Sequence, residues 1–467
     1  MKKATLTGMR VLLMIGLLTC IMVPAFAQSA GPGPLPKFDT GDTAWMQTST
    51  LLVLLMTVPG LALFYGGLVR SKNILSVMMQ SYVATGIITV QWCLFGYSLA
   101  FGAGQGATAP FVGDFSYALM HGVDAFRANS LAPTIPHQLF CMFQLMFAII
   151  TPALISGAIV ERMKFSAYCV FMLLWATFVY DPLAHMVWGG GWLGTHGALD
   201  FAGGSVVHMS SGFSALVLAM MLGRRKRSEG GEELRPHNLP FTMIGAGLLW
   251  VGWFGFNAGS ACGSNQLAVT AFTSTHVATA TAGLVWMAWD WIVYKKPTAL
   301  GFSSGLVAGL VAITPACGFV TPMGGAIIGA IVASVCFFTI KIKHAIKADD
   351  ALDVFGIHGM GGLTGCLCTG LFTVSALNPA IAKHNGLFNG GTFAESMVPQ
   401  LLDAGVTILM AVVGTIVLAL ITKVICGGLR SADEQEETGL DITDHGEAGY
   451  STEGGGSIFA PSFATAE

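Results

Sequence analysis

Long apolar segments separated by short polar connections dominate this sequence. Many of these segments carry no charge, and each is close to the ~20 residues that a helix needs to cross the hydrocarbon core of a membrane. Eleven such windows lie near residues 44–67, 76–103, 136–160, 166–187, 201–223, 240–258, 267–292, 299–317, 322–341, 353–375 and 398–425. The pattern predicts an all-α polytopic membrane protein with eleven transmembrane helices.

The distribution of basic residues predicts how these helices are oriented. Cytoplasmic connections of membrane proteins carry an excess of Lys and Arg. If the chain starts outside and crosses eleven times, 16 of its 22 Lys and Arg fall in inside connections and three fall outside; the other three lie in residues 1–27. One span more or fewer would destroy this asymmetry, so we expect the N-terminus outside and the C-terminus inside.

Spans one to five and six to ten are expected to form two repeats, at about 44–223 and 240–375, followed by a final helix. Five spans are an odd number, so the second repeat would insert upside down, as in many transporters. One loose echo supports the repeat: Asp200 with His208 in the first half, and Asp353 with His358 in the second.

The two ends of the chain differ from residues 28–425, which form the expected transmembrane domain. Residues 1–27 combine Lys2, Lys3 and Arg10 with a short apolar run and an Ala-Phe-Ala site, which predicts a cleaved secretory signal peptide. An uncleaved first helix is the alternative. Residues 426–467 are polar and predict a cytoplasmic tail.

Composition narrows the possible functions further. Hydrophobic residues make up 54% of the chain, charged residues 10%, and the net charge is −3, which excludes disorder and offers no basic stripe for nucleic acid. No hydrolase, phosphate-loop or zinc-protease motif is present in the sequence, so we expect no enzyme, no cofactor and no metal. The cysteines lie mostly in apolar spans and predict buried free thiols.

Some ionisable residues lie where a membrane span should be apolar. Asp200, His208 and His358 have small or apolar neighbours. Ionisable groups inside a membrane are costly and usually mark a site of function. Histidines that only bond to backbone carbonyls are the simpler alternative.

Some aromatic residues have suggestive spacing. Phe143 and Phe147 share one helix face, as do Phe256 and Ser260, because each pair is four residues apart. Trp188 precedes three glycines at an expected outer membrane surface, where Trp is usually an interfacial anchor. Alone, each of these residues fits core packing or anchoring better than a special role.

Several long segments, in order, resemble the ammonium transporter family (Amt/Mep/Rh), and the bacterial Amt branch in particular. They are LFYGGLVRSKNILS (63–76), VERMKF (160–165), HMVWGGGWL (185–193), DFAGGSVVH (200–208), GWFGFNAGSACGSNQ (252–266), DDALDVFGIHGMGG (349–362) and GLDITDHGE (439–447). The resemblance implies eleven helices around a pore in each subunit, a homotrimer, and residence in the bacterial cytoplasmic (inner) membrane among its lipids.

The resemblance also implies roles for residues along the pore. His208 and His358 match the family's paired pore histidines. Phe147 and Phe256 match its two stacked phenyl rings, which close the pore.

An outer ammonium site is implied in the same way. Trp188, Ser260 and Phe147 match the residues that recruit the cation, and Phe143 matches the ring that lines the approach. Asp200 matches the buried acid beneath the site.

These residue types suit ammonium transport. Ring faces attract cations, and a hydroxyl accepts hydrogen bonds that ammonium donates and potassium cannot. We therefore expect ammonium, or its analogue methylammonium, to bind outside, lose its proton and cross as ammonia. An ammonium sensor and a channel for another small neutral solute are the alternatives. The tail segment GLDITDHGE (439–447) resembles the family's C-terminal segment that lies under the pore, and the resemblance implies a PII-type regulator there, because PII signal proteins commonly block bacterial members of the family.

Overall fold

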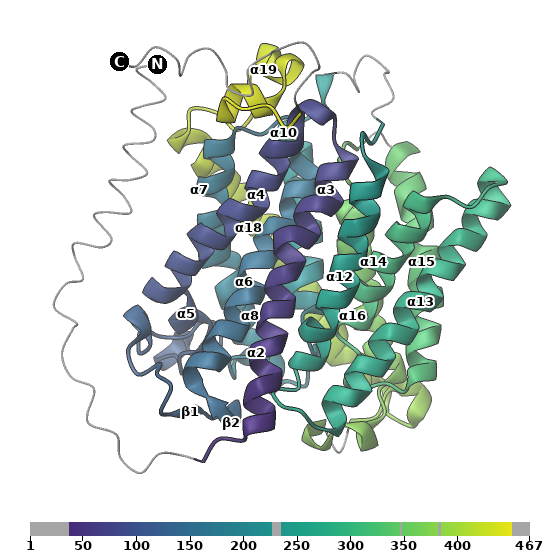
Figure 1. Ribbon diagram of the computed structural model, residues 1–467. Coiled ribbons are helices and arrows are strands. Elements are labelled where there is room, and N and C mark those ends of the chain that lie inside the picture. The colour runs from purple at the N-terminus through teal and green to yellow at the C-terminus, as the bar shows by residue number, and fades with distance from the viewer. Residues whose placement is uncertain (1–36, 227–234, 346–347, 382–383, 451–467) are drawn as a thin grey trace.

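A computed structural model describes residues 37–226, 235–345, 348–381 and 384–450 as one bundle of helices (Figure 1). The expected signal segment, residues 1–27, lies outside the described residues, as does the tail beyond residue 450. The helix α19 and the rest of the described tail lie at one end of the bundle, here called the tail end. A small antiparallel hairpin, β1 (Ala128–Asn129) and β2 (Ala132–Pro136), marks the opposite, hairpin end.

The bundle consists of α-helices joined by short connections. In chain order the α-helices are α2 (Thr40–Leu55), α3 (Ala62–Leu68), α4 (Ile74–Gln91), α5 (Tyr97–Phe101), α6 (His137–Ile159), α7 (Phe165–Trp175), α8 (Asp181–Val187), α9 (Trp192–Thr195), α10 (Ser210–Leu222), α12 (Leu239–Gly259), α13 (Gln266–Tyr294), α14 (Ala299–Ile313), α15 (Pro322–Ala345), α16 (Met360–Phe372), α17 (Phe393–Ser396), α18 (Val398–Ile425) and α19 (Asp433–Thr438). Each predicted apolar window coincides with one of these helices or with a run of them.

Eight helical runs within the described residues are long and apolar enough to cross a membrane. They are Thr40–Leu68, Ser71–Phe101, His137–Ile159, Phe165–Thr195, Gly204–Leu222, Leu239–Gly259, Pro322–Lys343 and Phe393–Ile425. α14 is a shorter apolar helix. The expectation of a multi-pass, mostly helical membrane protein is therefore confirmed.

Two widened helical turns carry the expected pore histidines. The π-helix η8 (Gly204–Met209) contains His208 and leads into α10, and η9 (Phe355–Gly359) contains His358 and leads into α16. π-turns are rare and often occur at functional sites. The helix that follows the first turn, α10, crosses η9 where a Cβ on Gly212 would lie 2.0 Å from the backbone nitrogen of Gly359, so only glycine permits this close crossing.

The acid that starts the second of these turns is not the expected one. Asp350, and not Asp353, accepts hydrogen bonds from the backbone N–H groups of Val354 (3.0 Å) and Phe355 (2.8 Å). Asp350 precedes His358 by eight residues, as Asp200 precedes His208. Asp353 has a positive φ of 59° and binds Lys343 instead. The acid of the second half that corresponds to Asp200 is therefore Asp350, three residues before the Asp353 that the sequence suggested.

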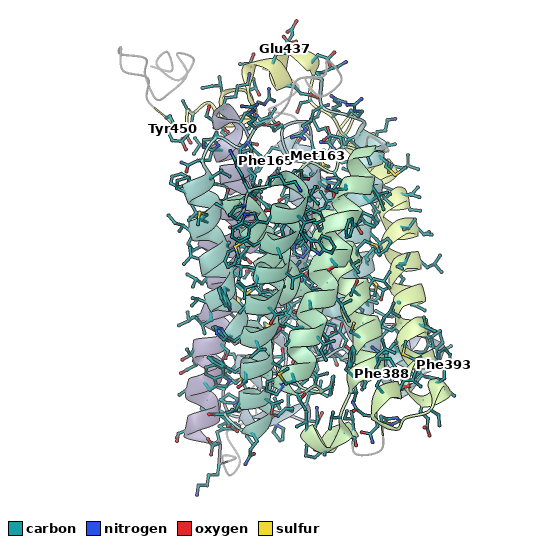
Figure 2. The ribbon with its side chains drawn as sticks, turned by 90° about the vertical axis from the view of Figure 1, so that its right-hand side faces the viewer. Met163, Phe165, Phe388, Phe393, Glu437 and Tyr450 are labelled. Atoms are coloured by element: carbon teal, nitrogen blue, oxygen red, sulfur yellow. The ribbon has the colours of Figure 1, made fainter. Side chains whose placement is uncertain are left out.

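The helices that follow the two turns run in opposite directions. α10 ends at the tail end, where Arg430 donates to the carbonyl of Leu222 (3.0 Å). α16 ends at Phe372, whose ring lies 5.4 Å from that of Phe388 at the opposite end (Figure 2).

The described part of the tail is docked against the bundle. Arg430 pairs with Glu436, and Asp441 accepts a hydrogen bond from the N–H of Ser76 at the start of α4 (2.8 Å). Glu437 and Tyr450 mark the tail in Figure 2, at the end that also holds Met163 and Phe165.

Buried ion pairs hold the connections at the tail end together. Arg225 binds both carboxylate oxygens of Asp349 and also reaches Glu161 at 3.2 Å, while Arg70 binds Glu161 at 2.9 Å. Burial alone would raise the pKa of Asp349, but Arg225 and Arg162 lower it to about 2. This end of the fold therefore depends on charge pairing.

Candidate functional site

Two stacked phenyl rings close the centre of the site. Phe147 on α6 and Phe256 on α12 lie with their ring centroids 4.3 Å apart and an angle of 33° between their planes. Both side chains are buried. Because the rings are in van der Waals contact, this phenyl pair leaves no open passage for a hydrated ion in the described conformation.

A cluster of aromatic rings lies on the hairpin side of the phenyl pair. Trp188, just after α8, meets the Phe147 ring edge to face at 6.0 Å, and Phe143 meets it at 5.0 Å. Trp188 is half-buried. The hydroxyl of Ser260 donates to the carbonyl of Phe256 (2.8 Å), which leaves its oxygen lone pairs available as acceptors.

The carboxylate of Asp200 organises the start of η8. It accepts hydrogen bonds from the N–H groups of Gly203 and Gly204 (both 2.7 Å), Ser205 (2.8 Å) and Val206 (3.2 Å), and from the Ser205 hydroxyl (2.7 Å). These donors are backbone N–H groups and one hydroxyl, so none of them brings a positive charge to the carboxyl group of Asp200. The carbonyl of Asp200 accepts the indole N–H of Trp188 at 2.9 Å, which ties this acid to the aromatic cluster.

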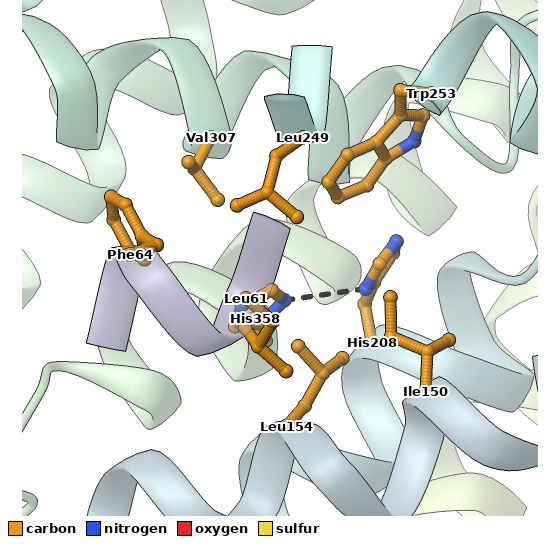
Figure 3. A pocket seen from close by; sticks show the side chains of 9 residues that line it. All are labelled: Leu61, Phe64, Ile150, Leu154, His208, Leu249, Trp253, Val307 and His358. Carbon is orange, nitrogen blue, oxygen red and sulfur yellow. Dashed lines mark hydrogen bonds between the residues drawn. The ribbon is translucent and has the colours of Figure 1, made fainter. Parts of the chain in front are cut away.

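The two histidines meet on the other side of the phenyl pair. His208 Nδ1 and His358 Nδ1 lie 3.3 Å apart, so one ring donates and the other accepts (Figure 3). The ring of His208 stacks over Phe256 at 5.8 Å and over Trp253 at 5.2 Å. His208 Nε2 is buried and has no hydrogen-bond partner in the described structure.

A narrow cavity surrounds the histidine pair. Its volume is about 10 Å³, which is near the smallest space that holds one water-sized molecule. Apart from the histidines its lining is apolar or aromatic, and Figure 3 shows these side chains around the two imidazole rings: Leu61, Phe64, Ile150, Leu154, His208, Leu249, Trp253, Val307 and His358.

Sequence reasoning missed the apolar wall of this cavity. Trp253 could have been found, because it lies three residues before Phe256 and therefore on the same helix face. Its indole N–H donates to Thr314 at 2.9 Å, so the ring is held in place. Leu61 and Val307 carry no local signal that separates them from other core residues.

All the residues expected at the pore are brought together. Ring contacts run without a break from Trp188 through Phe147, Phe256 and His208 to His358. His276, another histidine in a predicted span, is instead exposed on α13 and stacks on Trp250. The nine described cysteines are all free, and no group of three His, Cys, Asp or Glu side chains that could bind a metal occurs in the part of the chain that the structure describes.

Comparison with known proteins gives one consistent family. Residues 44–450 match the Ammonium Transporter Family. An ammonium transporter of Bacillus subtilis is 49% identical over 411 residues, covering 88% of this chain and 98% of the relative. One from Aquifex aeolicus is 48% identical and covers 95% of this chain and 100% of the relative. The crystal structure of Saccharomyces cerevisiae Mep2 superposes with a TM-score of 0.81 at 34% identity, covering 91% and 94% of the two chains.

Proposed function

This chain belongs to the ammonium transporter family, whose members are transporters and not enzymes, and from that premise we propose that it binds ammonium at an outer aromatic site, removes a proton and conducts ammonia past His208 and His358. One observation carries the proposal. The phenyl pair of Phe147 and Phe256 separates an aromatic cluster, whose ring faces can attract a cation, from an apolar cavity that fits one small molecule.

The aromatic cluster suits recognition of the ammonium cation. The ring face of Trp188, together with Phe147 and Phe143, attracts a cation by roughly 0.5–2 kcal/mol. Ser260 keeps acceptor lone pairs that ammonium can use and potassium cannot. The unpaired negative charge of Asp200 favours any cation bound nearby.

Loss of a proton lets the substrate pass the phenyl pair. A bare cation in an apolar membrane interior faces a penalty of about 2.5 kcal/mol or more. Ammonia carries no charge and avoids this cost. On the far side, the Nδ1 atoms of His208 and His358 are bonded to each other, so the two neutral imidazoles together offer ammonia one Nε2 donor and one Nε2 acceptor. The unpaired His208 Nε2 supports this role.

The membrane arrangement forms part of the same proposal. We place eleven helices in a bacterial inner membrane, with the hairpin end outside and the tail end inside, on the basis of the basic residues. The opposite directions of α10 and α16 support two inverted five-helix repeats. We also propose a homotrimer and a PII-type regulator that acts through the docked tail; a PII pull-down with and without nucleotide tests the second.

Uptake of labelled methylammonium into proteoliposomes tests the transport proposal. We expect saturable uptake that ammonium inhibits. Ammonium binding without flux would favour a sensor, and water or urea permeability without methylammonium uptake would favour a channel for neutral solutes.

Two matched variants test the phenyl pair. Phe256→Ala removes a ring between the outer site and the cavity, so we expect selectivity for ammonium over potassium to fall. Phe254→Ala is the control, because Phe254 lies on the same helix but stacks on Phe272 at 4.1 Å, outside the pair. Equal selectivity in the two variants would contradict a phenyl barrier.

A further inference from the structure

A cluster of lysines and aromatic rings at the tail end of α13 and α15 takes no part in the proposed transport. The two helices pack side by side at one edge of the bundle (Figure 1). The ammonium group of Lys341 on α15 lies over two rings, 5.0 Å from the centre of the Tyr294 ring on α13 and 5.2 Å from that of Phe337. Lys295 and Lys296 directly follow Tyr294. The three lysines are therefore gathered at the neighbouring ends of two helices.

Acids of the chain do not balance the charge of these lysines. Residues 266–345 contain one acid, Asp290, which is buried and accepts the hydroxyl of Thr298 at 2.5 Å. Counting all residues that the structure describes, none of the three lysines forms an ion pair. Lys343 differs from them, because it is buried and binds the two acids that precede η9. The cluster therefore presents positive charge that a bound anion could balance.

The rings beneath Lys341 form a fixed wall. Trp289 donates its indole N–H to Ser334 at 2.9 Å, and its ring contacts those of Phe337 and Phe338. Ring faces attract the ammonium group of Lys341 without using its N–H groups as directed hydrogen bonds. Lys341 donates no hydrogen bond to any described residue, so its three N–H groups are available to an anion.

The surface beside the lysines is apolar and exposed. Aromatic and lysine side chains with this arrangement are typical of the membrane interface, where they contact headgroups. An anionic phospholipid offers both matching parts, a phosphate for the lysines and acyl chains for the apolar surface. Inorganic phosphate has no acyl chains, and a zwitterionic phospholipid brings a positive charge of its own. The exposed side chains of this surface are Trp291, Ile292, Tyr294, Phe338 and Ile342.

We propose that Lys295, Lys296 and Lys341, with the rings of Tyr294 and Phe337, bind the phosphate headgroup of an anionic phospholipid in the leaflet at the tail end. Lys341 donates to the phosphate from its position over the rings, and the acyl chains lie along α13 and α15. The site is separate from the pore, so the proposal does not depend on which substrate crosses.

Tryptophan fluorescence in vesicles tests the proposal, because bromine atoms on acyl chains quench only nearby indole rings. The purified full-length protein is placed in mixed vesicles of phosphatidylglycerol and phosphatidylcholine, in which one lipid or the other is brominated. We expect brominated phosphatidylglycerol to quench more strongly than brominated phosphatidylcholine. This excess should disappear when Trp289→Phe and Trp291→Phe are combined, because these two rings lie beside the cluster.

A pair of lysine variants tests the role of charge. Lys341→Gln should reduce the preference for phosphatidylglycerol about fivefold, as expected for one basic residue near an anionic headgroup. Lys423→Gln is the matched control, because it removes an exposed lysine near the end of α18, outside the cluster, and should leave the preference unchanged.

Four results would overturn the proposal. The first two are equal quenching by the two brominated lipids in the wild type and an unchanged preference in Lys341→Gln. Loss of the preference on addition of inorganic phosphate would indicate a site for free anions instead. Quenching by both lipids that is unaffected by the two tryptophan changes would indicate that a second copy of the chain covers this face.

Discussion

The two histidine turns are built alike but differ in the charge around their acids. Asp200 and Asp350 each lie eight residues before a pore histidine, and each accepts hydrogen bonds from the first N–H groups of a π-turn. Asp200 has only neutral partners. Asp350 lies 3.9 Å from the ammonium group of Lys343, which also donates to the carbonyl of Asp350 and binds Asp353.

This difference supports the proposed direction of transport. The acid at the aromatic cluster has only neutral hydrogen-bond partners, while the acid at the tail end lies beside a lysine. Burial raises the pKa of Asp350, and Lys343 opposes that rise. An attractive end and a neutral end suit a site that collects ammonium on one side and releases ammonia on the other.

Exchanging each acid for its amide should show the largest contrast. Asp200→Asn removes the charge and one acceptor from a cap of five hydrogen bonds, each worth about 1.5–3 kcal/mol to a charged group, so we expect methylammonium uptake to fall at least roughly a hundredfold. Asp350→Asn should be milder, because Lys343 keeps Asp353 as a partner. Uptake per folded protein in proteoliposomes measures the effect of each variant. Equal losses of uptake in the two variants would contradict a difference in charge between the two turns.

Removing the lysine should make the second turn resemble the first. Lys343→Met leaves the buried Asp350 without its cation, and losing one partner of a buried ion pair costs about 3–5 kcal/mol. We expect a clear fall in the melting temperature in detergent. If a second change, Asp350→Asn, restores the melting temperature, the unpaired charge of Asp350 is the cause of the fall. A wild-type melting temperature in Lys343→Met would show that stability does not need the ion pair.

Changing both histidines tests what the two turns share. In His208→Asn with His358→Asn the cavity loses both imidazoles, and ammonia loses their donor and acceptor atoms. We expect at least roughly tenfold slower methylammonium uptake, because a change of 1.4 kcal/mol alters a rate about tenfold. His276→Asn, which changes an exposed histidine outside the pore, is the control. Unchanged uptake in the double variant would refute a role for the pair.

A further effect concerns stability at acid pH at the tail end. The pKa of Asp349 is about 2 in the folded protein and near 3.9 when unfolded, so its stabilising effect is complete above about pH 4 and is lost as pH falls toward 2. The loss should amount to about 2 kcal/mol. Melting curves of the wild type and Asp349→Asn should therefore converge between pH 4 and pH 2; a constant gap would contradict the assignment.

Much of the fold could be predicted because hydropathy and charge act locally. Each apolar window coincides with a helix or run of helices, since about 20 apolar residues are enough to specify a membrane-crossing segment. The residues carried over from the family resemblance also lie together, from Trp188 to His358. Spacing along a helix was sufficient to predict contacts between near neighbours such as Phe143 and Phe147.

Other features depend on which helices cross. Asp350 rather than Asp353 begins the second turn, because backbone geometry and Lys343 select between two acids three residues apart. Leu61 and Val307 have no distinguishing pattern in the sequence, and only the packing of the helices places them at the cavity. The sequence by itself determined the membrane helices and the kinds of residues at the pore. The tertiary structure alone decided which acid lies beside a lysine and which has only neutral hydrogen-bond partners, because such pairing depends on distances between residues far apart in the chain.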